Sequence, residues 1–275
     1  MGSGGTVGST RVGFVGAGRM GMPMVERLAT AGTDLVVYAR RPEAQATLDG
    51  LGVRHTAELA EAAGGADVLL LCLFSDKQLT EVDQPLLSAL PDGAVVASHV
   101  TGRASTLQAL AGRFPGVQLV DAPVSGGPGE ILAGKLTVLL GGAPEARARA
   151  GAVIRAYSDP VIETGELGSA LAVKLVNNFL FAANVQLAAA AVKLGEALGI
   201  DPAGLLSAVN VMSGGSSASG RMGTGAEAGD LDAFANRIGP FMKKDVAVCL
   251  EQADERGVDP GLLLDVVRQG PLPLL

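Results

Sequence analysis

Residues 11–26 read RVGFVGAGRMGMPMVE, a short apolar strand followed by a glycine-rich turn and a helical pattern. A G-x-G-x-x-G turn between a strand and a helix indicates a dinucleotide site. The first glycine permits a tight turn, the second lets backbone approach a pyrophosphate, and the third lets helix and strand pack closely. We expect the phosphates at the helix N-terminus rather than an ordinary glycine-rich loop. The predicted cofactor-binding residues here are Gly16, Ala17, Gly18, Arg19, Met20 and Gly21.

The next strand, expected at 34–38, indicates which dinucleotide is bound. It ends in Ala39-Arg40-Arg41, without the Asp or Glu that would hold the ribose 2′-OH of NAD. Two guanidiniums stand where planar, bidentate donors would clamp a 2′-phosphate. Ala39, Arg40 and Arg41 therefore predict NADP(H) in preference to NAD(H). The alternative is a solvated pair of loop arginines.

Charge, hydropathy and residue counts argue against several other classes of binding partner. The net charge of −7 argues against nucleic acid as a partner. The longest apolar runs, such as 68–74, are far shorter than a membrane span, so we expect no membrane partner. Two scattered cysteines, Cys72 and Cys249, suggest a reducing compartment and hence the cytoplasm. Two isolated histidines give no support to a metal site, and residues 1–10 are expected to be a flexible leader.

The pattern along the chain predicts an α/β protein in two parts. A doubly wound, Rossmann-type domain at 11–164 is expected to bind NADP(H), and a helical domain at 165–275 to bind substrate and dimerise. The second domain begins with a helix over about 168–198 that is apolar nearly all round, so it must be buried between domains or against another subunit. The strands expected in the first domain are 11–16, 34–38, 67–73, 94–98, 117–121, 136–140 and one near Val161. The further helices expected in the second domain are 202–213, 240–256 and 260–269, with a Ser/Gly-rich loop at 213–225.

Four blocks of sequence resemble the β-hydroxyacid dehydrogenases, which include 3-hydroxyisobutyrate dehydrogenase and tartronate semialdehyde reductase. They stand in the family's order: VGFVGAGRMGMPM, then DAPVSGG with AGKLTVLLGG, then GELGSALAVKLVNN, then FMKKD. The resemblance implies hydride transfer between nicotinamide and a small β-hydroxy acid or its aldehyde or oxo form. It also implies a small anionic substrate and a C-terminal domain like that of 6-phosphogluconate dehydrogenase. A homodimer, or a tetramer built from dimers, would cover the long helix.

The resemblance assigns catalytic roles to Lys174 and Asn178. Lys174 matches the catalytic lysine, and burial in an apolar helix is expected to lower its pKa toward neutrality, as an acid/base requires. Asn178 lies one helical turn further on the same face, where its amide would orient the substrate; Asn177 is expected to share that role. The alternative for Lys174 is a side chain that reaches the surface.

Substrate and cofactor contacts are expected from several loops. Ser125, Gly126 and Gly127 follow a strand end and form the kind of nest that captures a carboxylate; a plain tight turn is the alternative. Lys244 matches a family lysine that reaches the cofactor, and Asp245 is expected to orient that lysine or to contribute to packing. At the ends of the central strands, Leu73, Phe74 and Val100 are also expected to contact the cofactor.

The chain also departs from the family pattern. Where relatives have Asp-x-Ser-Thr-x-x-Pro, residues 97–103 read ASHVTGR, and His99 is expected to be either an extra hydrogen-bonding group facing the nicotinamide or a partly exposed loop residue. Glu130 replaces a frequent glycine, and Ala190 replaces a common Glu. Two alternative functions stay open: an imine reductase of the same superfamily, against which Lys174 argues, and a non-catalytic NADP-binding module.

Overall fold

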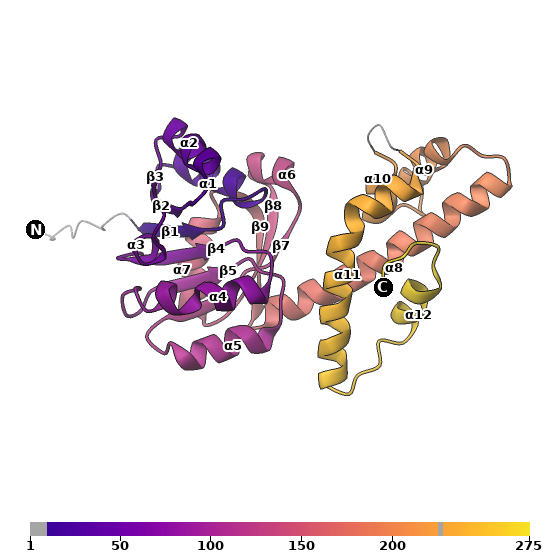
Figure 1. Ribbon diagram of the computed structural model, residues 1–275. Coiled ribbons are helices and arrows are strands. Elements are labelled where there is room, and N and C mark those ends of the chain that lie inside the picture. Colours follow the sequence, from indigo (N-terminus) through magenta and orange to yellow (C-terminus); the bar gives the residue numbers. More distant parts are fainter. Residues whose placement is uncertain (1–9, 225–227) are drawn as a thin grey trace, which may run out of the picture. The chain divides into compact units, whose positions relative to one another are not determined.

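The computed structural model describes residues 10–224 and 228–275. The expected leader therefore lies almost wholly outside the described residues, as does the last residue of the predicted 213–225 loop. The chain divides into two compact units, Met1–Lys174 and Leu175–Leu275, and helix α8 (Ser169–Ala197) is continuous through the boundary (Figure 1).

The first unit is built on one nine-stranded sheet. Its first six strands in chain order are all parallel and lie in the spatial order β3-β2-β1-β4-β5-β6, the order of a doubly wound dinucleotide-binding domain. The strands are β1 (Arg11–Val15), β2 (Asp34–Tyr38), β3 (Arg54–Thr56), β4 (Val68–Leu71), β5 (Val95–Ser98), β6 (Gln118–Asp121), β7 (Val124–Ser125), β8 (Leu136–Gly141) and β9 (Ser158–Gly165).

The far edge of the sheet differs from the predicted parallel arrangement. Strand β8 runs antiparallel to β6 and to the short β7, and β9 is parallel to β8. The Ser125 segment therefore belongs to a two-residue strand paired with β8, rather than to a free turn. Strands β3 and β7 were not expected from the sequence, whereas the other seven lie within a few residues of their predicted places.

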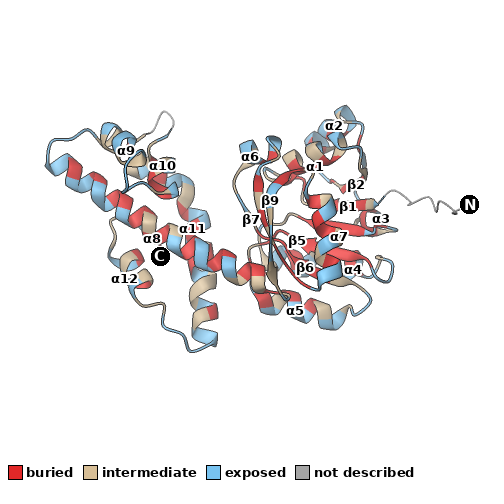
Figure 2. Ribbon diagram, turned by 180° about the vertical axis from the view of Figure 1, so that it is seen from behind, coloured by how far each residue is buried: buried red, intermediate tan, exposed pale blue. Residues whose placement is uncertain are grey.

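Two hydrophobic clusters cover the two faces of the sheet. One joins the strands to α1 (Gly21–Thr30), α2 (Pro42–Gly50) and α7 (Pro144–Ile154). The other joins them to α4 (Asp76–Leu87) and α5 (Ala104–Arg113) and includes Leu171 from the first turn of α8. The red, buried residues in Figure 2 accordingly follow the strands and the inward sides of these helices. Two five-residue helices, α3 (Leu59–Ala63) and α6 (Pro128–Leu132), complete the unit.

The second unit is helical and packs around α8. Its other helices are α9 (Pro202–Asn210), α10 (Ser217–Met222), α11 (Leu231–Glu255) and α12 (Leu262–Gln269). Gln186 of α8 is 1% exposed; its amide nitrogen donates to the carbonyls of Val267 and Leu272, and its oxygen accepts from the amide of Leu272. These bonds fasten the C-terminal segment to α8.

Two predictions for this unit were wrong. Helix α11 begins at Leu231 rather than at Pro240, because Asp230 caps it through the amide of Ala233 at 2.9 Å and Phe234 is buried. The Ser/Gly-rich segment is not a continuous loop. Ser216 accepts from the amide of Ser219 and caps the short helix α10.

In the single chain, helix α8 is buried on one side, and burial of its other side against another subunit stays a prediction. Leu180, Leu187 and Leu194 are 49%, 56% and 62% exposed. Among the described residues, α8 is the one helix long and apolar enough to cross a membrane, with 56% of that window buried inside the protein. Buried core helices of soluble proteins meet the same length and composition test.

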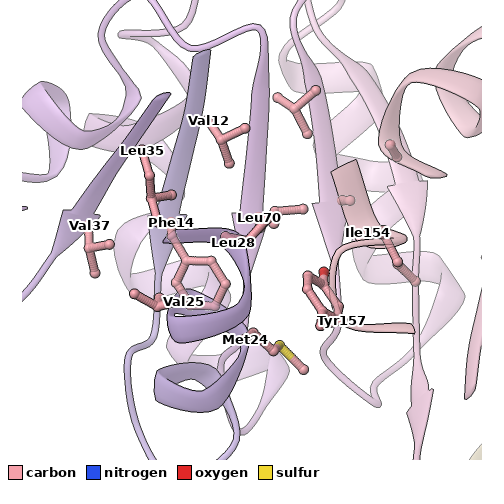
Figure 3. Packing of buried hydrophobic residues seen from close by; sticks show 14 of the residues in the cluster. Val12, Phe14, Met24, Val25, Leu28, Leu35, Val37, Leu70, Ile154 and Tyr157 are labelled. Carbon is pink, nitrogen blue, oxygen red and sulfur yellow. The ribbon is translucent and has the colours of Figure 1, made fainter. Parts of the chain in front are cut away.

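A polar pair lies inside the first hydrophobic cluster. Tyr157 is fully buried among apolar side chains that include Phe14 and Ile154 (Figure 3), and its hydroxyl lies 2.8 Å from His99 Nε2. His99 Nδ1 lies 2.5 Å from the carbonyl oxygen of Ala122. His99 is 5% exposed, so the alternative of a partly exposed loop residue is wrong: both ring nitrogens have hydrogen-bond partners inside the core.

Protonation of His99 should destabilise the fold. Burial lowers the pKa of His99 from 6.5 to about 4, against a smaller upward effect of the Ala122 hydrogen bond. The unfolded chain then binds a proton at a higher pH than the folded chain, so the stability contribution is complete above pH 6.5 and is lost as pH falls toward 4. We expect a loss of about 3 kcal/mol over this window, measured by urea unfolding. His99→Asn should lack this component, and an identical pH slope in both proteins would contradict the assignment.

Candidate active site

The parallel strands point their carboxyl ends at one edge of the first unit, where doubly wound proteins bind ligands. The glycine turn lies there, directly after β1. Gly16 has φ +107°, and a Cβ on it would lie 2.2 Å from the carbonyl oxygen of Cys72. A Cβ on Gly21 would lie 2.0 Å from the carbonyl oxygen of Gly16, whereas Gly18 faces open space. This is the arrangement that a pyrophosphate needs: two glycines close the turn and the middle one leaves room for a ligand.

The rest of the predicted cofactor loop is compatible with an anion. Helix α1 has no acidic residue in its first turn, so its positive end is not neutralised locally. Arg19 is exposed, Met20 is half-buried and Ala17 is buried. Burial raises the pKa of the nearby Cys72 thiol to about 12, so this cysteine stays protonated at neutral pH.

The two arginines after β2 are both exposed. The guanidinium carbon of Arg40 lies 5.8 Å from the centroid of the Tyr38 ring, a cation–π distance. Arg41 is the extended N-cap residue of α2. Ala39, which lies between the end of β2 and the two arginines, is buried, and its carbonyl accepts from the side chain of Gln45.

Side chains connect the loops that follow β4 and β5. Phe74 is 52% exposed, and its amide donates to Gln78 at 2.9 Å. Asp76 accepts from the amide of Arg103 at 2.8 Å and so joins the start of α4 to the loop after β5. Leu73 is half-buried, and Val100 is 2% exposed. Of the three residues predicted here, Phe74 presents the most surface to a ligand.

Asp121, at the end of β6, holds the N-terminus of α8. Its two carboxylate oxygens accept from the amides of Gly168 and Leu171, each at 2.8 Å, and the residue is fully buried. Burial raises the pKa of Asp121, and these backbone donors offset part of the rise. The role of Asp121 was not predicted from the sequence, where it appears only within the DAPVSGG block, because its partners lie 47 and 50 positions further along the chain.

Lys174 follows Leu171 by three positions on α8 and is 9% exposed. The alternative of a surface lysine is therefore wrong. Asn178 is 6% exposed, and the periodicity of α8 puts it one turn beyond Lys174 on the same side. Asn177 is exposed, and its side-chain nitrogen donates to the Asn178 amide oxygen at 3.1 Å.

A carboxylate on α11 orients Asn178. The side-chain nitrogen of Asn178 donates to Asp245 Oδ2 at 2.6 Å, and because a carboxylate only accepts, the amide NH2 must face it. Lys244 Nζ lies 3.3 Å from Asp245 Oδ1, long for a charge-assisted hydrogen bond but within reach of an ion pair. Asp245 thus contacts both Lys244, as expected, and Asn178, a link that sequence reasoning did not find.

The Ser125-Gly126-Gly127 segment carries its own carboxylate. Ser125 is exposed, and Gly126 has φ +136°. The amide of Gly127 donates to Glu130 Oε2 at 2.9 Å, so the side chain that replaces a family glycine already occupies one of the predicted anion donors. Any substrate carboxylate using that amide would have to displace Glu130. Among the described residues, no three His, Cys, Asp or Glu side chains gather so as to hold a metal ion.

Comparisons with known proteins agree with this arrangement. Residues 11–177 match the family described as the NAD binding domain of 6-phosphogluconate dehydrogenase. Residues 168–270 match the family described as the NAD-binding domain of NADP-dependent 3-hydroxyisobutyrate dehydrogenase. The two matches together cover both units.

Individual relatives share about a third of the aligned residues. An uncharacterized oxidoreductase of Mycobacterium tuberculosis is 34% identical over 196 residues, 70% of this chain and 66% of that protein. Mouse mitochondrial 3-hydroxyisobutyrate dehydrogenase is 31% identical over 210 residues, 74% of this chain and 63% of that protein. The matched segments thus span slightly less than two thirds of these relatives.

Among solved structures, M. tuberculosis 3-hydroxyisobutyrate dehydrogenase with L-serine superposes with a TM-score of 0.81 at 24% identity. The match covers 94% of this chain and 91% of that one. At that identity the likeness concerns the fold alone. The family matches and the relatives above 30% identity carry the conclusion: the chain belongs to the β-hydroxyacid dehydrogenase family, as a divergent member.

Proposed function

We propose that the protein is an NADP-dependent oxidoreductase that interconverts a small β-hydroxy acid and its aldehyde or oxo form, with Lys174 as general acid/base. The observation that carries the proposal is a buried lysine on a helix whose first turn is fastened by Asp121 to the carboxyl edge of the dinucleotide-binding sheet. Lysine side chains are seldom buried to this extent.

The residues of the glycine turn would hold the pyrophosphate, and bound NADPH would supply a hydride. For the proton, Lys174 would donate to the carbonyl oxygen during reduction and accept from the hydroxyl during oxidation. Asn178 is held by Asp245 and would hydrogen-bond the same oxygen or a neighbouring substrate group. Ser125 and Gly127 would bind the substrate carboxylate after Glu130 is displaced, and we place Lys244 toward the cofactor.

We also propose a preference for NADP(H) over NAD(H). Arg40 is exposed, stacked on Tyr38 and next to Arg41, which suits a guanidinium that receives a phosphate from solvent. The lack of a carboxylate at the end of β2 leaves the ribose of NAD without its usual acceptor.

A second copy of the chain is the proposed partner for α8. Exposed leucines recur every seven residues at 180, 187 and 194, the spacing by which one helix packs along another. A homodimer, or a tetramer of such dimers, would remove this strip from water. With two reduced cysteines, we place the protein in the cytoplasm.

The cofactor preference can be tested at Arg40. Arg40→Asp should weaken NADP+ binding about 10- to 100-fold, because a charge-assisted hydrogen bond contributes about 1.5–3 kcal/mol, and should leave NAD+ binding unchanged or improved. Calorimetric titration of both cofactors measures this, with the exposed Arg155→Asp as a charge-matched control. Equal losses for both cofactors would contradict the assignment.

The chemistry can be tested at Lys174. Lys174→Ala should lower kcat about 10²- to 10⁴-fold with NADPH affinity little changed, and Lys174→Arg should be almost as inactive because a guanidinium does not release its proton near neutral pH. Lys193→Ala, at an exposed position of the same helix, is the control. Near-normal turnover of the Arg variant would reduce the role of Lys174 to charge alone.

The substrate panel separates the alternatives. NADPH consumption is followed with short aldehydes, 3-oxo acids and cyclic imines. Turnover of the imines alone would identify an imine reductase. Tight NADPH binding without turnover of any compound would indicate a non-catalytic module.

Assembly can be tested on α8. Light scattering at micromolar concentration should give a dimer or tetramer, and Leu187→Glu should shift the mass toward the monomer by placing a charge on the apolar strip. Lys193→Glu introduces the same residue off the strip and should leave the mass unchanged. A monomeric wild-type protein would refute the proposed assembly.

A further inference from the structure

The Tyr157–His99 pair is connected to the backbone that leads to Ser125. The amide of Ala122 donates to the carbonyl of Ser98 at 2.7 Å, and its carbonyl oxygen lies 2.5 Å from His99 Nδ1. Both backbone groups of Ala122 are therefore held by the β5 end of the sheet. Ser125 follows three positions later, and Asp121, which caps α8, precedes immediately.

The hydrogen-bond partners determine the tautomer of His99. A carbonyl oxygen only accepts, so Nδ1 must carry the proton. Neutral His99 then presents the Nε2 lone pair to the Tyr157 hydroxyl, which donates at 2.8 Å. The two rings meet edge to face, with centroids 5.9 Å apart and planes at 79°. The order of donation is thus Tyr157 to His99 to Ala122.

We propose that His99 and Tyr157 are positioning residues that fix the Ala122–Ser125 segment, and with it the substrate contacts of Ser125 and Gly127. The proposal rests on the function proposed above, which puts the substrate at this segment. Neither side chain touches the reacting atoms, because both are buried in the core. Their effect reaches the site through the carbonyl of Ala122.

A fixed segment matters because small displacements of binding groups weaken a reaction strongly; a shift of about 1 Å can lower the rate about 10²-fold. A serine at position 99 would be too short to span the two partners of His99. His99 and Tyr157, which is the only tyrosine in the sequence besides Tyr38, thus hold the segment through one chain of hydrogen bonds that needs both side chains.

Three variants test the proposal. Tyr157→Phe keeps the ring and removes only the hydroxyl. His99→Asn keeps a donor near the position of Nδ1 and removes the bond to Tyr157, and His99→Leu removes both bonds. We expect kcat/KM for the substrate to fall about 10- to 100-fold in His99→Leu and less in the other two, with NADPH affinity within about twofold of wild type.

Matched controls separate positioning from loss of stability. Ile154→Val removes a methyl group from the same hydrophobic cluster, and His55→Asn changes the other histidine, whose Nε2 lies 3.0 Å from Asp49 Oδ1 on the surface. Both should retain wild-type kcat/KM at a temperature where all variants are folded. A loss in Ile154→Val equal to that in His99→Leu would overturn the proposal, because general softening of the core would then explain both.

Two further readouts decide the matter. Amide hydrogen exchange across residues 122–127 should accelerate at least about tenfold in His99→Leu and Tyr157→Phe and not in the controls. This test needs no turnover, so it holds even if the wild-type enzyme reduces none of the substrates tested and the proposed function fails. The pH profile of kcat/KM should keep its shape in all variants. Unchanged exchange, or loss of an ionisation between pH 5 and 9, would overturn the proposal.

Discussion

The buried carboxylate of Asp121 fastens the start of helix α8, three residues before Lys174, to the sheet of the first unit. It ends β6, the last of the six mutually parallel strands, and accepts from the amides of Gly168 and Leu171 at the start of α8. Helix N-termini leave such donors unsatisfied, and a carboxylate there also interacts favourably with the helix dipole. Because Lys174 follows three positions after Leu171, these hydrogen bonds and the packing of Leu171 in the second hydrophobic cluster set the position of its backbone relative to β6.

The other functional loops lie at the same edge of the sheet, and a different local contact holds each of them. The glycine turn is closed by contacts that tolerate no Cβ at Gly16 or Gly21. Asp76 joins the loop after β5 to the start of α4, and His99 holds the residue after β6. Asn178 is oriented separately, by Asp245 within the helical unit. The sheet thus supplies a rigid frame, and single side chains align the loops on it.

The sequence predicted those features that depend on local pattern. The apolar runs of β1, β2, β4, β5 and β6 and the uninterrupted helix α8 follow from periodicity, and the glycine turn follows from its flanking elements. Strand β3 was missed because Arg54-His55-Thr56 is short, polar and at the sheet edge. The start of α11 was misplaced because a proline inside a helix resembles a helix beginning.

Long-range side-chain contacts could not be predicted in the same way. Asp121 meets α8 across 47 positions, Asn178 meets Asp245 across 67, and His99 meets Tyr157 across 58. No spacing rule connects such residues, since only the completed topology brings them together. His99 illustrates the difficulty: its local sequence resembles an exposed loop, while its partners place it in the core.

The most direct test of this account is to weaken the contact between Asp121 and α8 without removing its shape. Asp121→Asn keeps one acceptor oxygen and turns an NH2 group toward the second amide donor, so exchange of the Gly168 and Leu171 amides should accelerate and turnover should fall, with NADPH affinity retained. Amide exchange and single-turnover kinetics on the same folded sample measure both effects. Faster exchange at these two amides with wild-type turnover would contradict the claim that this contact positions Lys174.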